Sequence, residues 1–215
     1  MASDSRPERT RDAARTKQRL LDAAREEFAE YGIAGARVER IAAAARCNRA
    51  LIYAYFDSKD GLFDAAFAAH VQAHLDRVNF DGTDLPAYAG RLFDIFEDDP
   101  AVIRLASWYR LERSNGPGLD AVISANESRL AKLRQAQREG KLTDRWDATA
   151  ILVLVQSIAG AWATLNPEFS MTRTTGRAKR RLAVIDAVTR LIAPDGHPDA
   201  AADGLGLRGK QTRPA

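Results

Sequence analysis

Residues 38–59 read VERIAAAARCNRALIYAYFDSK, and this stretch decides how the whole chain is interpreted. Its apolar periodicity predicts two short helices, about 38–45 and 49–55, separated by a break at 46–48. Helices this short are unstable alone, so they must pack on each other and on a neighbouring helix. Four small or apolar side chains are expected to form the shared core: Ile41, Ala45, Cys47 and Ile52.

Two short helices joined by a tight turn are the pattern of the helix-turn-helix, whose second helix enters the major groove of DNA. The outward side of that helix offers Arg49, Ala50 and Tyr53. Arginine suits bidentate donation to guanine, and small residues let the backbone approach the bases. Tyr55 and Lys59 are placed to reach phosphates. The stretch therefore predicts sequence-specific binding of double-stranded DNA.

The turn between these helices leaves several roles open. Asn48 suits a base contact and the capping of the following helix equally well. Cys47 is expected to be a small buried apolar residue, with redox sensing as the alternative. Arg46 either contacts a phosphate or is simply solvated.

Almost every other segment also has helical periodicity, and the sequence contains no strand-like alternation, hairpin signal or internal repeat. The first helix is expected over about 12–31, and two late ones over about 146–165 and 174–193. Four residues with capping side chains are expected to begin helices: Ser58, Asp84, Asp99 and Asp144. The sequence thus predicts an all-α fold of about nine helices.

The composition limits the class of protein. The 215 residues carry 32 Lys and Arg against 29 Asp and Glu, and this net charge of +3 excludes a polycation that coats nucleic acid indiscriminately. The single cysteine excludes an intramolecular disulfide and suits a reducing compartment. No secretory signal is visible, and the longest apolar stretch, 150–165, is too short for a membrane span. We therefore expect a cytoplasmic protein with no membrane partner.

Both ends of the chain are expected to be disordered, because they are too poor in apolar side chains to pack. Residues 1–60 hold 12 Lys and Arg against 10 acids, and six of these basic residues crowd the amino terminus. A basic arm there is placed to touch the DNA backbone or the minor groove.

Five features occur together within residues 32–63: Gly32, Ile41-Ala42, Tyr53, Phe56 and the run SKDGLF at 58–63. In this combination they resemble the amino-terminal domain of the tetracycline-repressor (TetR) family. The resemblance implies a homodimeric regulator that binds a near-palindromic operator, usually a repressor released by a small molecule. It also implies that residues 48–55 form the recognition helix and that Lys59 lies at the phosphate-facing start of the fourth helix.

Three positions depart from the family pattern, which usually has Thr at Arg37, Gly at Arg46 and Val at Cys47. Where the family's Thr would contact a phosphate through its hydroxyl, Arg37 offers a longer, charged side chain for the same contact. If Arg46 adopts a positive φ, it carries strain of about 1 kcal/mol. The full set expected to contact DNA is Arg37, Arg46, Asn48, Arg49, Ala50, Tyr53, Tyr55 and Lys59.

The helical layout divides the chain into four parts. Residues 1–11 are the disordered basic arm and 12–57 the helix-turn-helix domain. Residues 58–194 are expected to bind a ligand and to dimerise, and 195–215 form a disordered tail.

Aromatic side chains of the middle helices are expected to line an effector cavity, with plain core packing as the alternative. His70 and His74 are four residues apart, so both can face one metal ion or ligand. No third ligand is offered at helical spacing, so no metal site is expected. The acidic run 97–99 is interpreted as a solvated helix end, with attraction of a cationic effector as the alternative. The effector-binding candidates are Phe67, His70, His74, Phe93, Phe96, Trp108, Tyr109 and Trp162.

The helix expected over 146–165 is apolar nearly all round and must be buried. With the last helix it is the natural dimerisation pair, a four-helix bundle across a twofold axis, and core packing within one chain is the alternative. Basic residues between 173 and 181 are interpreted as a solvated face. The candidates for the dimer interface are Leu154, Ile158, Ala161, Leu182, Ile185 and Val188.

The sequence therefore favours a transcription regulator, most often a repressor in such a family, released by a small and mostly apolar effector. One alternative is an all-α enzyme or small-molecule-binding protein, and another is a TetR-like adaptor that binds protein. The chain contains no Gly-rich phosphate loop, HExxH motif or nucleophile elbow. We therefore expect no enzymatic activity and no cofactor.

Overall fold

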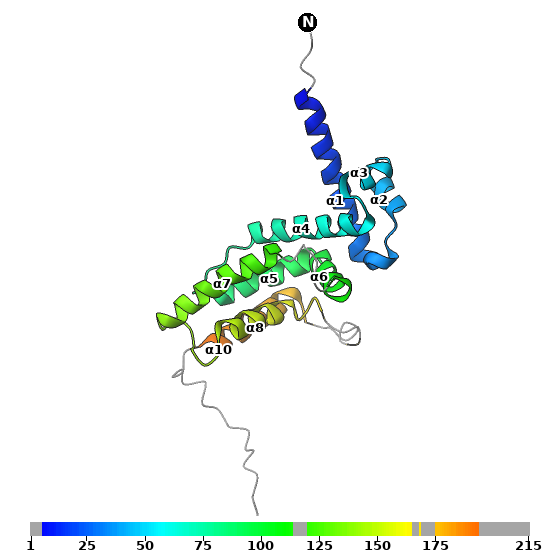
Figure 1. Cartoon of the computed structure of the whole chain (residues 1–215). Coiled ribbons are helices and arrows are strands. Elements are labelled where there is room, and N and C mark those ends of the chain that lie inside the picture. Colours follow the sequence, from blue (N-terminus) through cyan, green and yellow to red (C-terminus); the bar gives the residue numbers. More distant parts are fainter. Residues whose placement is uncertain (1–5, 114–119, 165–167, 169–174, 194–215) are drawn as a thin grey trace, which may run out of the picture.

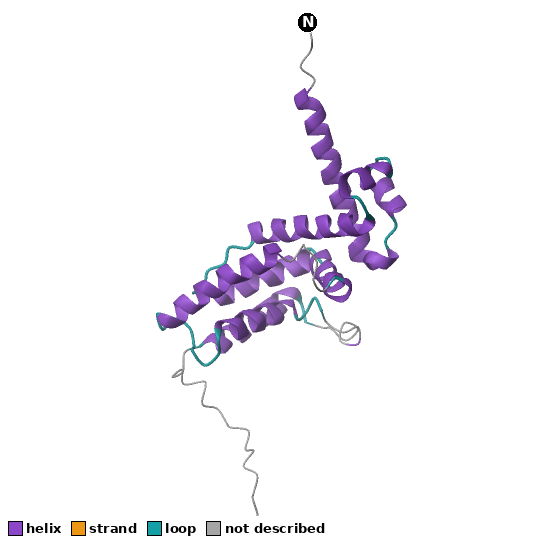
Figure 2. Ribbon diagram, viewed as in Figure 1, coloured by secondary structure: helices purple, strands orange, loops and turns teal. Residues whose placement is uncertain are grey.

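In the computed structural model, residues 6–113, 120–164, 168 and 175–193 are described, and their regular elements are all helices (Figures 1 and 2). The expected all-α fold is confirmed. The predicted disordered tail at 195–215 lies outside the described residues. The helices with described bounds are α1 (Arg6–Gly35), α2 (Val38–Ala44), α3 (Ala50–Phe56), α4 (Lys59–Arg77), α5 (Leu85–Asp98), α6 (Ala101–Glu112), α7 (Asp120–Arg138), α8 (Ala148–Gly160) and α10 (Arg177–Ile192).

Helix α1 is the longest element, about 45 Å over its 30 residues, and its first half projects from the body (Figure 1). It begins at Arg6 rather than at residue 12, so residues 6–11, expected to be disordered, are helical. The helix is kinked at Gly32, whose φ is 68°. A β-carbon there would lie 3.0 Å from the ring of Trp108, so glycine satisfies both the backbone angle and the close approach of α6.

Two hydrophobic cores hold the helices together. The first joins α1–α4 to α6 around Phe63, which is fully buried and meets Phe28 edge-on at a centroid distance of 5.1 Å. The second joins α5, α7, α8 and α10 around Phe93, Leu133 and Ile151. Helix α4 follows α3 directly and packs on α1, α6 and α7, so it connects the two halves of the molecule.

Two of the predicted helix caps are confirmed. The Ser58 hydroxyl accepts a hydrogen bond from the Gly61 N–H at 2.9 Å, and the Asp84 carboxylate accepts one from the Ala87 N–H at 3.1 Å. Each satisfies a backbone donor that the first turn of a helix leaves free.

The other two predicted caps are wrong. Asp99 makes no capping bond, because its carboxylate accepts a hydrogen bond from Arg25 of α1 at 2.6 Å instead. Helix α8 is capped by Asp147, which accepts from two backbone N–H groups at 2.7 and 2.9 Å, and not by Asp144. The last helix begins at Arg177, three residues later than expected.

Helices α5 and α10 are joined by ion pairs, and Arg180 is buried, which corrects the interpretation of this residue as part of a solvated face; Arg177 and Lys179 are exposed as expected. Arg180 is only 4% exposed, and its two terminal nitrogens donate to the two carboxylate oxygens of Glu97, both at 2.6 Å. Arg177 donates to Asp98 at 2.6 Å, and Arg181 donates to Asp94 at 2.8 Å. Of the rest of that cluster, Arg173 lies outside the described residues.

None of the helices in the described part of the chain combines the length and the apolar character that crossing a bilayer requires.

Candidate functional site

The helix-turn-helix forms as predicted from α2, a tight turn and α3. Ile41, Ala45 and Ile52 are buried at its centre, while Cys47 is half-buried against the same core. Arg46 has a φ of 52°, so the residue that replaces the family's turn glycine does adopt the left-handed conformation. The turn is closed by backbone hydrogen bonds, including the Cys47 N–H to the Ala42 carbonyl at 3.0 Å.

Most residues predicted to contact DNA lie on the exposed side of this unit. Tyr53 is 44% exposed on α3, next to solvent-facing Arg49 and Ala50. Among the described residues, Arg49 is bound only by Glu39, at 2.6 Å, in a pair of side chains that are each 60% exposed. Such a surface pair is weak, so Arg49 is available to another partner. The exposed members of the predicted set are Arg37, Arg46, Asn48, Arg49, Ala50 and Tyr53.

Three of the predicted residues also have internal partners. The Asn48 side-chain oxygen accepts the Ala50 N–H at 2.8 Å, which favours the capping role that the sequence left open. Tyr55 is half-buried, and its ring lies 6.1 Å from that of Phe56. The Lys59 ammonium donates to the Ala36 carbonyl at 3.3 Å, so this side chain braces the α1–α2 turn as well as lying at the start of α4.

Glu27 of α1 is a residue that the sequence pattern did not indicate. It is 9% exposed, and its carboxylate accepts hydrogen bonds from the Arg37 N–H at 2.8 Å and the Arg40 Nε at 2.7 Å. The carboxylate thus binds the N–H of the residue that precedes α2, where its negative charge also interacts favourably with the amino-terminal end of the α2 dipole. Burial raises the pKa of Glu27, but the hydrogen bonds from Arg40 and Arg37 outweigh burial and hold the pKa below 4.5.

Replacing Glu27 by Gln is expected to destabilise the protein by about 1–3 kcal/mol at neutral pH, because it removes the buried charged acceptor of two hydrogen bonds. The lowered pKa means that this contribution is present above pH 4.5 and is lost as the pH falls through the folded-state value. Urea unfolding at several pH values measures both effects. Glu30→Gln is the control, since Glu30 is 56% exposed, and it is expected to cost less than about 1 kcal/mol. Equal losses in both variants would contradict the role of Glu27.

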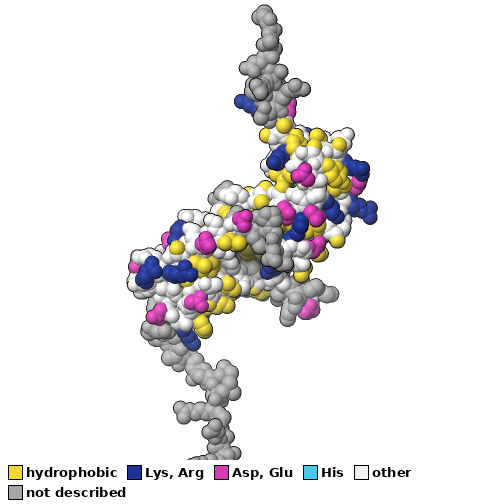
Figure 3. Space-filling model, in the orientation of Figure 1, with side chains coloured by type: hydrophobic (Ala, Val, Ile, Leu, Met, Phe, Trp, Pro, Cys, Tyr) yellow, Lys and Arg dark blue, Asp and Glu magenta, His cyan; other side chains and the backbone are white. Residues whose placement is uncertain are grey.

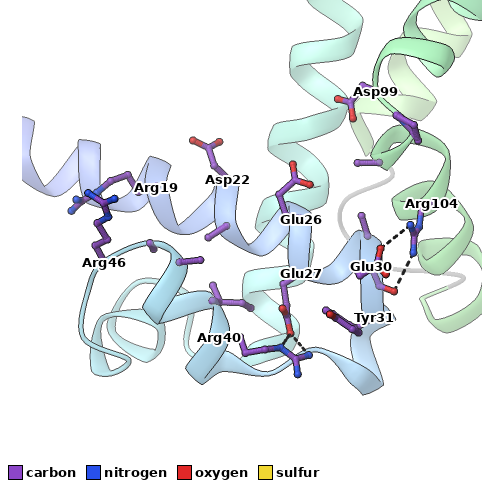
Figure 4. Close-up of a pocket in the computed structure, with 17 residues that line it drawn as sticks. Arg19, Asp22, Glu26, Glu27, Glu30, Tyr31, Arg40, Arg46, Asp99 and Arg104 are labelled. Atoms are coloured by element: carbon purple, nitrogen blue, oxygen red, sulfur yellow. Dashed lines mark hydrogen bonds and ion pairs between the residues drawn. The ribbon is translucent and has the colours of Figure 1, made fainter.

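A cleft of about 980 Å³ separates α1 and α2 from the start of α6 (Figure 4). Its walls are strongly charged, and Figure 4 shows ion pairs from Arg40 to Glu27 and from Arg104 to Glu30 along one side. Sequence patterns did not predict this cleft, because α6 follows α1 by about seventy residues. The labelled residues that line it are Arg19, Asp22, Glu26, Glu27, Glu30, Tyr31, Arg40, Arg46, Asp99 and Arg104.

The aromatic effector candidates do not surround one space. Phe67 stacks on Tyr109 at 4.1 Å in the first core, and Phe93 with the half-buried Phe96 and Trp162 belongs to the second. Trp108 packs against Gly32. None of these side chains lines the 980 Å³ cleft or the two smaller hollows beside Phe80. The structure therefore places them in the core, and their binding role stays a prediction.

The two histidines of α4 lie together, with ring centroids 4.6 Å apart. Asp99, between α5 and α6, brings a carboxylate to them, and one ligand atom from each of the three residues lies within 4.8 Å of the others. Burial lowers the pKa of His70 to about 4 and also lowers the pKa of His74. The sequence missed this third side chain because Asp99 follows His74 by a whole intervening helix.

The expected dimer residues have unequal exposure. Leu154 of α8 is 39% exposed and Leu182 of α10 is 65% exposed, and Ala161 is exposed beyond the end of α8. Ile158 and Ile185 are half-buried. Val188 is fully buried inside its own chain, so its assignment to an exposed dimer surface is wrong.

Two family models match the chain. Residues 20–66 match the model described as bacterial regulatory proteins of the tetR family, and residues 84–190 match the tetracyclin repressor-like C-terminal domain. The chain is 35% identical over 161 residues to the HTH-type transcriptional repressor SCO4008 of Streptomyces coelicolor. This match covers 74% of the chain and 83% of that relative.

Solved structures give the same result. The transcriptional regulator SCO4942 of Streptomyces coelicolor is 41% identical and superimposes with a TM-score of 0.74, over 82% of this chain and 98% of that one. The regulator FadR of Bacillus subtilis, solved with stearoyl-CoA, is 16% identical with a TM-score of 0.59 over 80% of this chain and 96% of that one, which shows a shared fold alone. From the matched helix-turn-helix and carboxy-terminal domain together, we conclude that the chain belongs to the TetR family of DNA-binding transcriptional regulators.

Proposed function

We propose that the protein is a homodimeric repressor that holds a near-palindromic operator through α3 of each subunit and releases it when a small, mostly apolar molecule binds. The observation that carries this proposal is the exposed face of α3, where Arg49, Ala50 and Tyr53 lie side by side without a strong internal partner. The similarity to the repressor SCO4008, at 35% identity, supports repression rather than activation of transcription. Family membership favours a regulator over the enzyme alternative.

Arg49 supplies the donors for base recognition in this proposal. Its guanidinium leaves the exposed Glu39 for a guanine edge at little cost, because both side chains are solvated. Figure 3 shows Lys and Arg side chains along the outer edge of the α1–α3 domain, in positions suited to phosphates. The domain 12–57 then reads DNA, and the domain 58–194 carries the dimer and effector functions.

The homodimer is proposed to form through α8 and α10, which pack on each other. Val153, Leu154 and Leu182 are 55%, 39% and 65% exposed on these two helices. A twofold axis beside these helices would bury these apolar side chains in a four-helix bundle. Two recognition helices would then lie about 34–36 Å apart, one turn of DNA.

Release is proposed to act through α4, which follows the reading helix and packs on α1, α6 and α7. An effector that separates these helices shifts the position of α4, and with it the spacing of the two α3 helices. It shifts the equilibrium only as far as it binds the spread state more tightly. Because the target is DNA, we place the protein in the cytoplasm.

Replacing Arg49 by Ala is expected to remove about 1–3 kcal/mol of operator discrimination, because a bidentate base contact is lost. The operator is obtained by selecting bound fragments of the source genome, and binding is measured on it and on scrambled DNA. Arg134→Ala on α7, also exposed, is the matched control and should leave both affinities unchanged. If Arg49→Ala keeps the wild-type preference for the operator, Arg49 does not read a base.

A further inference from the structure

We propose that His70, His74 and Asp99 form a binding site for a divalent transition-metal ion of the zinc class. This site goes beyond the regulator function proposed above and does not depend on it. One ligand atom from each residue lies within 4.8 Å of the other two. The three side chains come from α4 and from the α5–α6 junction, so an ion held among them would join separate parts of the fold.

Three of the four ring nitrogens of the two histidines are buried without a hydrogen-bond partner among the described residues. His70 is 8% exposed, and its Nε2 is buried without a hydrogen bond. Both ring nitrogens of His74 are buried and unpaired as well. Buried polar atoms normally have a hydrogen-bond partner, and leaving one without a partner is destabilising. Two imidazoles with unpaired nitrogens, side by side and next to a carboxylate, therefore indicate a ligand that accepts one lone pair from each ring.

The donor set selects the class of ion. Two imidazoles and one carboxylate suit Zn²⁺, Co²⁺, Ni²⁺ and Cu²⁺, whereas Mg²⁺ and Ca²⁺ prefer oxygen ligands alone. Zinc bonds of about 2.0–2.1 Å in a tetrahedral site place ligand atoms about 3.4 Å apart. The observed limit of 4.8 Å therefore needs a closing of no more than about 1.4 Å, within the reach of side-chain rotation. Three protein ligands leave a fourth position for water or for a donor from a bound molecule.

The residues around Asp99 support the site. Arg25 of α1 donates to the Asp99 Oδ2 at 2.6 Å, which leaves the other oxygen for the ion and orients the carboxylate. The charge of Arg25 is shared with Glu26, which it also contacts, so its repulsion of a cation is reduced. Asp99 also lines the 980 Å³ cleft, so this one ligand of the site borders the cleft. Metal binding would thereby tie α1 to α4 and α6.

The test is direct titration of the full-length protein. After treatment with a chelator, ZnCl₂ is added in a calorimeter, and Co²⁺ absorption reports the geometry of the ligands. We expect one ion per chain and a higher melting temperature with Zn²⁺, since an ion that binds only the folded chain stabilises it. MgCl₂ should produce no heat of binding. The absence of one-to-one Zn²⁺ binding at micromolar concentration would overturn the proposal.

Variants locate the ion. The double variant His70→Gln/His74→Gln and the single variant Asp99→Asn should each weaken Zn²⁺ binding by at least about 10–100-fold. Circular dichroism checks that each variant is folded, and Asp99→Asn tests the site without altering the buried imidazoles. His197→Gln is the control, because the third histidine of the sequence lies outside the described residues. Zn²⁺ binding that survives the double variant, or that is lost in His197→Gln, would place the ion elsewhere.

Discussion

Replacing Glu97 by Gln is expected to lower the free energy of unfolding by about 3–5 kcal/mol. The change leaves the Arg180 guanidinium, whose side chain is 5% exposed, without its charged partner between α5 and α10. The rings of Phe93 and Trp162 lie 5.7 and 5.6 Å from that guanidinium and do not replace a carboxylate. Guanidinium or urea unfolding at fixed protein concentration measures the loss as a shift in midpoint.

The neighbouring residue supplies the control. Asp98 pairs with Arg177 at the surface, where the two side chains are 58% and 46% exposed, so Asp98→Asn should leave the unfolding midpoint almost unchanged. The double variant Glu97→Met/Arg180→Met should recover most of the wild-type stability, because it removes both buried charges. Equal losses for Glu97→Gln and Asp98→Asn would show that burial does not distinguish the two pairs.

Replacing Phe63 by Ala is expected to lower the free energy of unfolding by a similar amount, about 3–5 kcal/mol, because the missing ring leaves a cavity. Phe63 is fully buried and contacts rings from three helices, with Phe28 at 5.1 Å, Phe67 at 6.3 Å and Tyr109 at 5.9 Å. This cavity would lie in the first core, where the helix-turn-helix packs on α4 and α6. Thermal and denaturant unfolding of the single variant measure the change.

Tyr53→Ala separates stability from DNA binding. Tyr53 is 44% exposed, so its removal should change stability by no more than about 0.5 kcal/mol while weakening operator binding. Phe63→Ala should show the opposite balance, since Phe63 lies away from the exposed face of α3. A stable Phe63→Ala protein would contradict the cavity argument.

Most of the fold could be predicted from patterns among residues that are close in sequence. The helix-turn-helix could be predicted because its signal lies within two dozen residues, and the caps at Ser58 and Asp84 because a cap bonds only to its own helix. The left-handed conformation of Arg46, which the sequence comparison left as a condition, occurs in the turn. Each of these features depends on sequence neighbours alone.

Long-range competition explains what the sequence could not show. Asp99 lost its capping role to Arg25, which precedes it by 74 residues, and Glu97 pairs with Arg180, which follows it by 83. Glu27 and the charged cleft likewise arise from segments that meet only after folding. The proposed metal site is a further case. His70 and His74 are four residues apart and can be recognised in the sequence, whereas Asp99 reaches them only in the folded chain.

The pairing of α10 with α5 also shapes the electric field of the molecule. Arg177, Arg180 and Arg181 are each matched by a nearby acid, so beyond a Debye length of about 8–10 Å their charges largely cancel. In the described part of the chain, no ion pair engages Arg19 or Arg46 at the opposite end. Basic residues of the α1–α3 domain without an acidic partner are therefore free to attract the duplex before contact, and the association rate should fall as ionic strength rises.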